Sequence, residues 1–430
     1  MGTVALWDDR GSGHRAFQSV TTSATDLFRY DKGETMRMLI HGGTIFTDGN
    51  LFEHTNVRIN QEGWISEVGA GLEPVNDELV INAEGLTLLP GLIDCHVHIT
   101  FSGLPDPSGR VSMTAADAAL IGARNAYETL LGGFTTVRSL GGLDNAEIAL
   151  SRAQRAGTIT GARIIPAGRV ICMTGGHSHF WGREVDGPDE ARKAAREQLK
   201  AGAEVIKLIA TGGILTEGVD PGQAELTESE MRAAVQVAHR AGKKAVAHAQ
   251  GADGIKNALE AGIDSIEHGI FLTEELIRHM VQHGTYLVPT LSAATKILEY
   301  GTAHGIPAYA VDKARRLASI RQANIKNAIR SGVRIALGTD AGTPFNRHGD
   351  NFHELALLVE YGLEPLQALN AATAQAADNI GLGNEIGRIQ SGFRADLVLI
   401  SGSMDEPFAR FKERIVYILQ QGKMVRGLDG

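Results

Sequence analysis

The chain has 430 residues, of which 43% are hydrophobic, so it can bury a sizeable core. Its formal net charge of −9 argues against a surface for nucleic acid or for an anionic membrane. The two cysteines, Cys95 and Cys172, form no disulfide framework, and no apolar run reaches the roughly 18 residues that a membrane-spanning helix needs. The N-terminus has no basic segment followed by an apolar one, so no signal peptide is evident and we expect a cytoplasmic protein.

Both ends of the chain predict short strands and turns. Residues 1–37 are polar and weakly patterned, and we expect either a tail or an arm that covers a neighbouring subunit. Apolar runs bounded by turn residues follow at 38–41, 57–59, 65–68 and 78–81, with turns at Gly42-Gly43 and Asp48-Gly49-Asn50. The same pattern of short apolar runs recurs at 396–400 and 415–419, with a hairpin turn at Gln421-Gly422-Lys423. We therefore predict one small β-sandwich domain built from residues 38–90 and 385–430.

Residues 91–384 alternate strand and helix patterns. The expected strands are 92–99, 135–140, 163–171, 205–210, 244–249, 265–268, 286–291 and 334–338. Helical patterns lie between them, such as 253–261 and 227–241, which begins with a Thr227-Glu228-Ser229-Glu230 capping box; Thr273 is a weaker start signal for the next helix. Eight strands, each followed by a helix or a long loop, predict an α/β fold of the TIM (β/α)8 barrel type. A doubly wound open sheet is the main alternative, but no G-x-G-x-x-G pattern follows the first strand.

Two histidines close the first strand of this middle region. Successive side chains of a strand point to opposite faces, so His96 and His98 share one face, with Cα atoms roughly 6.6 Å apart. Two imidazoles at this spacing can bind one metal ion. Taken alone, the pattern is explained equally well by two hydrogen-bonded core histidines.

Four more polar side chains lie where other predicted strands end, and active groups of parallel barrels gather at the carboxyl ends of strands. They are Lys207, His248, His268 and Asp340. Each has a structural explanation by itself: a lysine can extend to solvent, a histidine can be hydrogen-bonded in a core, and an aspartate can cap a helix. A single site explains all of them together with the two histidines of the first strand, so we favour a site.

In these motifs the chain resembles the amidohydrolase superfamily, over residues 38–425. The motifs are PGLIDCHVH at 90–98, the strands with Lys207 and His248, IEHG at 266–269, LGTDAG at 337–342 and the closing stretch 387–398. The resemblance implies two divalent metal ions, usually zinc, one bound by His96, His98 and Asp340 and the other by His248 and His268. Lys207 would carry a carbamate, formed with CO2, that bridges the ions. A bridging hydroxide would attack the amide carbonyl, and Asp340 would pass its proton to the leaving nitrogen.

A narrower resemblance lies in GFTTVR at 133–138 and TGGH at 174–177, which are similar to Xaa-Pro and Xaa-Arg dipeptidases and ochratoxin-cleaving amidases. This branch implies a dipeptide or an N-acyl amino acid as the substrate, and proteins of the superfamily often form homo-oligomers. His177 would donate to the scissile carbonyl or bind the substrate carboxylate; a solvent-facing loop histidine is the alternative. His179, Phe180 and Trp181 could line the pocket.

Two positions depart from this branch. Ser139 stands where the branch usually has an acidic residue, and Leu226 stands where it often has a tyrosine. The pocket could therefore fit a non-peptide amide, a carbamate, a urea or a lactam, including xenobiotics and mycotoxins. Phe345 lies on a loop that could determine which of these substrate classes fits the pocket. On the same loop, Arg347 or His348 could pair with a substrate carboxylate; the alternative is that they are solvated.

Two other classes of function are disfavoured. Deaminases of the superfamily usually keep one metal ion, whereas Lys207 suits a site with two. A metal-free structural relative would lack ligands, whereas this chain retains all six candidates.

Overall fold

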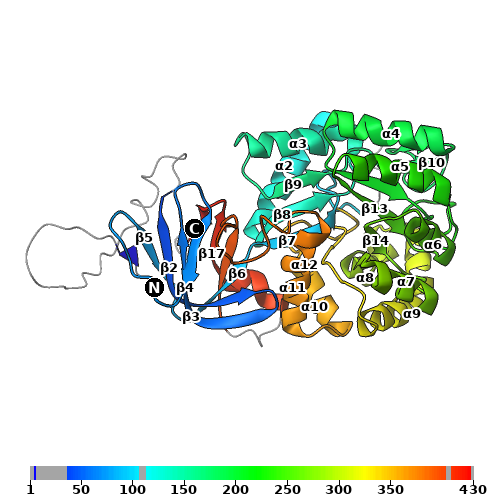
Figure 1. Cartoon of the computed structure of the whole chain (residues 1–430). Coiled ribbons are helices and arrows are strands. Elements are labelled where there is room, and N and C mark those ends of the chain that lie inside the picture. Colours follow the sequence, from blue (N-terminus) through cyan, green and yellow to red (C-terminus); the bar gives the residue numbers. More distant parts are fainter. Residues whose placement is uncertain (1–3, 6–35, 106–112, 403–407, 428–430) are drawn as a thin grey trace, which may run out of the picture. The chain divides into compact units, whose positions relative to one another are not determined.

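The computed structural model describes residues 4–5, 36–105, 113–402 and 408–427 (Figure 1). The chain divides into two compact units: one contains the residues up to Leu92 and from Leu382 onward, and the other spans Ile93–Gly381. Within the described ranges, no helix combines the length and the apolar character that crossing a membrane requires.

The first unit is built around one β-sheet that takes strands from both ends of the chain. Nine strands belong to it in the described residues, in the order β1-β5-β2-β6-β16-β17-β18, with β3 and β4 continuing from β2. Their bounds are β1 Val4–Ala5, β2 Met38–Thr47, β3 Asn50–Ile59, β4 Ile65–Gly69, β5 Leu79–Asn82, β6 Leu86–Pro90, β16 Leu397–Ser401, β17 Ile415–Gln420 and β18 Lys423–Arg426. Strand β16 pairs antiparallel with β6, which joins the two chain ends in the sheet (Figure 1).

Of the two turns predicted between residues 38 and 59, one is present and the other is not. Asp48 and Gly49, with φ of 47° and 78°, form the predicted tight turn between β2 and β3, which matches the right-handed twist of the paired strands. The turn predicted at Gly42-Gly43 is wrong. Strand β2 continues through both glycines, and its register with β3 shifts between Ile40 and Gly43, as in a β-bulge.

The second unit is an α/β structure with parallel sheets. One sheet has the order β7-β8-β9 and the other β11-β10-β12-β13-β14-β15, and the pairs β8–β9, β10–β11, β10–β12, β12–β13, β13–β14 and β14–β15 are parallel. The bounds are β7 Leu92–Val97, β8 Phe134–Ser139, β9 Arg163–Pro166, β10 Ile171–Met173, β11 Arg183–Val185, β12 Val205–Ile209, β13 Lys244–Ala249, β14 Ser265–His268 and β15 Tyr286–Val288. Apart from β11, the strands are buried on both faces along almost their whole length, as parallel strands between helices are.

Helices follow most of these strands and lie outside them (Figure 1). Their bounds are α2 Ala115–Leu131, α3 Ala146–Arg155, α4 Pro188–Ala201, α5 Glu228–Arg240, α6 Ala252–Glu260, α7 Glu274–His283, α8 Leu291–Tyr300, α9 Ala308–Arg330, α10 His353–Glu360, α11 Pro365–Ala371, α12 Ala374–Asn379 and, in the first unit, α13 Phe411–Arg414. The predicted capping box is present at α5, where Thr227 and Glu230 each accept a hydrogen bond from the other's backbone N–H. Thr273 caps α7 through the N–H of Leu276.

Two predicted strands differ from the structure. The stretch 163–171 forms two strands, β9 and β10, in different sheets. The stretch 334–338 is extended chain with a single bridge, Leu287 to Ile335, rather than a strand. Its ladder is interrupted because the Leu337 N–H donates to the Ala371 carbonyl (2.8 Å) at the end of α11.

A buried carboxyl group ties α3 to the strands beneath it. Glu147 is fully buried and accepts hydrogen bonds from the N–H groups of Ala167 (2.7 Å) and Gly168 (2.6 Å) and from the Ser139 hydroxyl. Burial raises its pKa to about 8, although these donors act in the opposite direction. Ser139, which departs from the family pattern, thus serves as a partner of this carboxyl group.

This raised pKa predicts how stability depends on pH. Between about pH 4.5 and about pH 8 the folded state holds a proton on Glu147 that the unfolded state has lost, so stability falls as pH rises through this window, by on the order of 1 kcal/mol per unit. We expect Glu147→Gln to remove this component, so that its Tm falls less than the wild-type Tm across the window. The exposed Glu62, changed to Gln, is the control. Parallel Tm curves for wild type and E147Q would contradict the prediction.

Candidate active site

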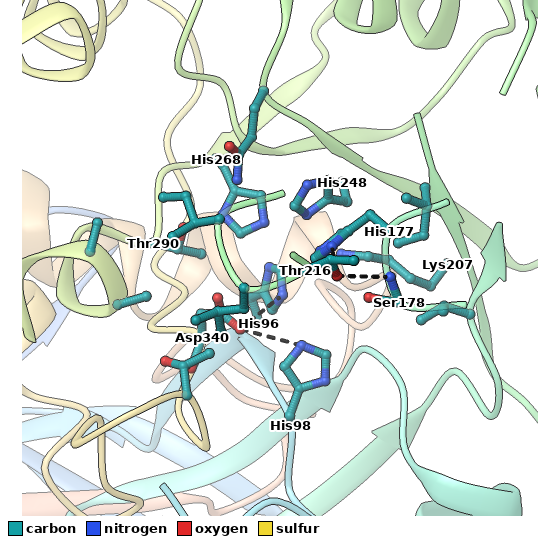
Figure 2. Close-up of a pocket in the computed structure, with 18 of the residues that line it drawn as sticks. His96, His98, His177, Ser178, Lys207, Thr216, His248, His268, Thr290 and Asp340 are labelled. Carbon is teal, nitrogen blue, oxygen red and sulfur yellow. Dashed lines mark hydrogen bonds and ion pairs between the residues drawn. The ribbon is translucent and has the colours of Figure 1, made fainter. Parts of the chain in front are cut away.

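A cavity of about 80 Å³ lies in the second unit, at the carboxyl ends of its parallel strands. All six predicted metal-binding residues line it: His96, His98, Lys207, His248, His268 and Asp340. Figure 2 shows these side chains, together with His177, around one space. The structure therefore brings together side chains from β7, β12, β13 and β14 and from the segment that follows the extended chain at 334–338.

His96 and His98 approach the same carboxylate. Their Nε2 atoms lie 3.5 Å and 3.3 Å from Asp340 Oδ1. The Nδ1 atom of His96 is 2.8 Å from Glu267 Oε2, and that of His98 is 2.9 Å from the Gly141 carbonyl oxygen. Because an acceptor on Nδ1 keeps the proton there, both Nε2 lone pairs are directed at the space beside Asp340.

His248 and His268 form the other side of the group, with ring centroids 4.5 Å apart. His268 Nδ1 is 2.6 Å from the Thr290 hydroxyl, and His248 Nε2 is 3.0 Å from the Gly212 carbonyl oxygen, so Nδ1 is the unengaged nitrogen of His248. One ligand atom each from His96, His268 and Asp340 lie within 4.8 Å of one another, close enough to hold one ion. The structure thus groups His268 with His96 and Asp340 as well as with His248.

Lys207 is the most unusual member of the group. Its side chain is 2% exposed, and its Nζ atom has no hydrogen-bond partner among the described residues. Burial lowers its pKa to about 8. A buried ammonium without a partner is costly, so this position favours the neutral amine or a partner from outside the chain.

Burial also keeps the imidazoles neutral. It lowers the pKa of His268 to about 4 and that of His177 to about 3, and it holds those of His96 and His248 well below the ordinary histidine value. Neutral imidazole is the form that binds metal ions, so the metal-ligand candidates His96, His248 and His268 are in that form at neutral pH.

Backbone strain is concentrated at the same residues. His268, Thr290 and Asp340 have φ of 74°, 49° and 60°, in the left-handed region that residues other than glycine rarely adopt. Thr290 is β-branched, which makes its conformation the most costly of the three. Strain of this kind persists where the surrounding structure holds side chains for a function, and here it aims the His268 ring and the Asp340 carboxylate into the cavity.

A buried charge relay, which the sequence did not lead us to expect, holds His96. Arg138 Nη2 donates to Glu267 Oε1 (3.0 Å), and the other oxygen of Glu267 accepts from His96 Nδ1. Ser265 also donates to Glu267 Oε1 (2.6 Å), and the Arg138 and Glu267 side chains are fully buried. The sequence did contain a signal for this pair: Arg138 and Glu267 are charged residues within the predicted strands 135–140 and 265–268.

His177 reaches the cavity from the loop after β10. Its Nδ1 atom is 2.7 Å from the Thr216 hydroxyl, and its backbone N–H donates to both carboxylate oxygens of Glu225 (2.8 and 2.9 Å). The ring lies over Gly213, where an added Cβ would be 2.4 Å from the imidazole, and 4.4 Å from the ring of His248. These contacts leave Nε2 of His177 for a ligand.

The predicted substrate contacts divide into two groups. Phe180 and Trp181 line the cavity, as does His177, whereas His179, Phe345, Arg347 and His348 do not. His179 and Arg347 are exposed, Phe345 stacks on Tyr300 (4.1 Å), and His348 Nε2 is 3.2 Å from the His98 carbonyl oxygen. The roles of His179, Arg347 and His348 in substrate binding stay predictions. Arg321, which the sequence did not single out, does line the cavity.

Comparisons with known proteins agree on one family. The sequence model of the amidohydrolase family matches residues 87–427. The ochratoxinase of Aspergillus niger is 31% identical over 374 residues, which cover 79% of this chain and 76% of that protein. The crystal structure of a Xaa-Pro dipeptidase with bound methionine in the active site has a TM-score of 0.84 and 32% identity, covering 91% of this chain and 100% of that chain. A prolidase complexed with N-methylphosphonate-L-proline has a TM-score of 0.84 and 29% identity, with the same coverage. The predicted resemblance is confirmed.

The charge relay predicts a measurable effect on metal binding. In Glu267→Gln the amide can donate to His96 Nδ1, which would move the ring proton to Nε2, and the Arg138 charge loses its counterion. We expect zinc affinity to fall roughly 10- to 100-fold and the free energy of unfolding to fall by about 3 kcal/mol. Competition with a chromophoric chelator and denaturant unfolding measure the two quantities.

The matched control is Glu260→Gln, because Glu260 is exposed and lies outside the cavity. Unchanged zinc affinity in E267Q would show that Glu267 does not orient His96.

Proposed function

Because the chain belongs to the amidohydrolase family, whose members include amide- and peptide-hydrolysing enzymes, we propose that it hydrolyses a dipeptide or an N-acyl amino acid with the help of divalent metal ions. The observation that carries this proposal is the convergence of five histidine side chains, one carboxylate and one unpartnered lysine at one cavity. We also infer that the two parallel sheets belong to one (β/α)8 barrel. Two parallel bridges support this inference. The segment 335–341 is joined to β15 by the bridge Leu287–Ile335 and to β7 by the bridge Val97–Ala341, so it connects one sheet to the other.

The residues fit a pair of metal ions, preferably zinc, which binds imidazole nitrogen and carboxylate oxygen. His96, His98 and Asp340 would hold one ion, and His248 and His268 the other. The Nζ atom of Lys207 and the Oδ1 atom of Asp340 are buried without a hydrogen-bond partner in the described structure, as expected of groups that complete their coordination with a ligand. A carbamate on Lys207 would replace a buried ammonium with oxygen ligands. When bound, such ions lower the pKa of water towards 7 and polarise a carbonyl.

The residues of the chain would act around that chemistry. Asp340 Oδ1 lies beside the Nε2 atoms of His96 and His98, where it can accept a proton from the attacking water and return it to the leaving nitrogen. His177, whose Nδ1 atom is engaged by Thr216, presents Nε2 to the scissile carbonyl or to a substrate group beside it. The aromatic walls at Phe101 and Trp181 limit the access of bulk water.

The ligands named for the similar structures support a substrate with a free carboxylate, since methionine and the proline derivative both carry one. One observation favours the second candidate, a non-peptide amide, carbamate, urea or lactam. The wall of the cavity is mainly apolar. Leu226, which stands where relatives often carry a tyrosine, is fully buried and does not line the cavity.

The substrate class is tested by free-amine release. With zinc and bicarbonate supplied, we expect the enzyme to cleave dipeptides and N-acyl amino acids in preference to matched neutral amides, carbamates and aryl ureas. We expect a strong chelator to abolish this activity and added zinc to restore it. Amine release from the neutral set alone would overturn the dipeptidase assignment in favour of the second candidate.

The bridging role of Lys207 is tested by its removal. We expect Lys207→Ala to lose bound metal and activity together, because the variant lacks the atom on which the carbamate forms. Metal content by mass spectrometry, after preparation with bicarbonate, measures the loss. Lys256→Ala, which changes an exposed helical lysine, is the control. A K207A protein that retained its metal and its activity would refute the bridge.

A further inference from the structure

One cation at the cavity has no role in the chemistry described above. Arg321, on α9, is 7% exposed and lines the same cavity as the metal-ligand candidates. Its Nε atom is buried with no hydrogen-bond partner in the described part of the chain. No ion pair joins it to any described acidic residue, in contrast to the exposed Arg315 and Arg316 of the same helix, each of which contacts an aspartate.

The position of Arg321 on its helix explains its burial. Leu317, Arg321 and Ile325 are spaced by four residues, so they lie on one face of α9, and all three are buried. Ala294 and Ile297 of α8 and Ile270 line the cavity together with Arg321. Leu317 packs in one cluster with Ile270, Ala294 and Ile297, so the face of α9 that carries Arg321 lies against the apolar part of the cavity wall.

Two other buried cations of this unit, Arg138 and Lys313, have their partners within the chain, whereas Lys207 belongs to the proposed metal site. Arg138 pairs with Glu267, and Lys313, two turns before Arg321 on α9, donates to the carbonyl oxygens of Gly213 (3.2 Å), Thr216 (2.6 Å) and Val219 (2.5 Å). Asp340 is the one described carboxylate that lines the cavity, and its Oδ1 atom faces His96 and His98. A buried guanidinium without an anion is costly, so the missing anion is expected from a ligand.

We propose that Arg321 binds the free carboxylate on the amine half of the substrate and thereby makes the enzyme select amides of amino acids. This inference rests on the proposed function and defines its substrate class. In an N-acyl amino acid with an uncharged side chain the α-carboxylate is the one ionised group, and the planar guanidinium can donate two parallel N–H···O hydrogen bonds to it. The apolar neighbours of Arg321 exclude water from this ion pair, which strengthens it.

The test compares two substrates that differ only in this charge, N-acetyl-L-methionine and N-acetyl-L-methioninamide. Release of the free α-amine gives kcat/KM for each. We expect Arg321→Met to lower the ratio of acid over carboxamide on the order of 100-fold, mainly through KM for the acid, and Arg321→Lys to lower it less. Arg315→Met, an exposed change on the same helix, is the matched control and should keep the wild-type ratio.

Binding provides a second readout that does not depend on turnover. L-Methionine should raise the Tm of the wild type more than L-methioninamide does, and this difference should disappear in R321M. An unchanged substrate ratio in R321M, or in R321K if R321M does not fold, would overturn the proposal. If the wild type cleaves neither substrate, the proposed function fails for this class. The Tm difference then still decides whether Arg321 binds a carboxylate.

Discussion

The buried ion pair between Arg138 and Glu267 is the interaction on which the site depends. Arg138, on β8, donates through Nε to the Cys95 carbonyl of β7 (2.6 Å) and through Nη2 to Glu267 of β14, so one side chain fixes the relative position of three strands. Glu267 then holds the ring of His96. Two buried charges are stable only with good geometry and further donors, and Ser265 and His96 supply these. The relay therefore links the packing of the sheets to the orientation of a metal-ligand candidate.

The loop after β12 is held by a different set of contacts. Lys313 gathers three carbonyl oxygens of the loop after β12, and Thr216 of that loop fixes the ring of His177. A compact ammonium with three donors suits convergent carbonyls, whereas a planar guanidinium suits a carboxylate. The two buried cations of α9 thus match two different partners: a loop of the chain for Lys313 and, in our proposal, the substrate for Arg321.

The sequence predicted what depends on local pattern. Strands β13 and β14 coincide with their predicted ranges because apolar runs bounded by glycine and helix signals define them. The six metal-ligand candidates could be named because strand ends converge in parallel sheets. The stretch 334–338 was predicted as a strand because its composition is apolar, but the Leu337 amide bonds to α11, which no local pattern reveals. Glu267 and Arg321 were missed for a related reason: a charge within an apolar stripe signals burial, but its partner lies far away in the sequence.

The distribution of charge in the cavity bears on the choice between substrate classes. The apolar wall would suit a neutral amide if Arg321 did not also line the cavity. A neutral ligand, however, would displace water from Arg321 without supplying an anion, and leaving a buried charge unpaired costs several kcal/mol. A ligand with a carboxylate avoids this cost and gains an ion pair in the same apolar surroundings. In our proposal, the apolar wall and the unpartnered guanidinium together favour apolar amino acids in amide linkage, because apolar surroundings strengthen the ion pair and the ion pair positions the apolar side chain.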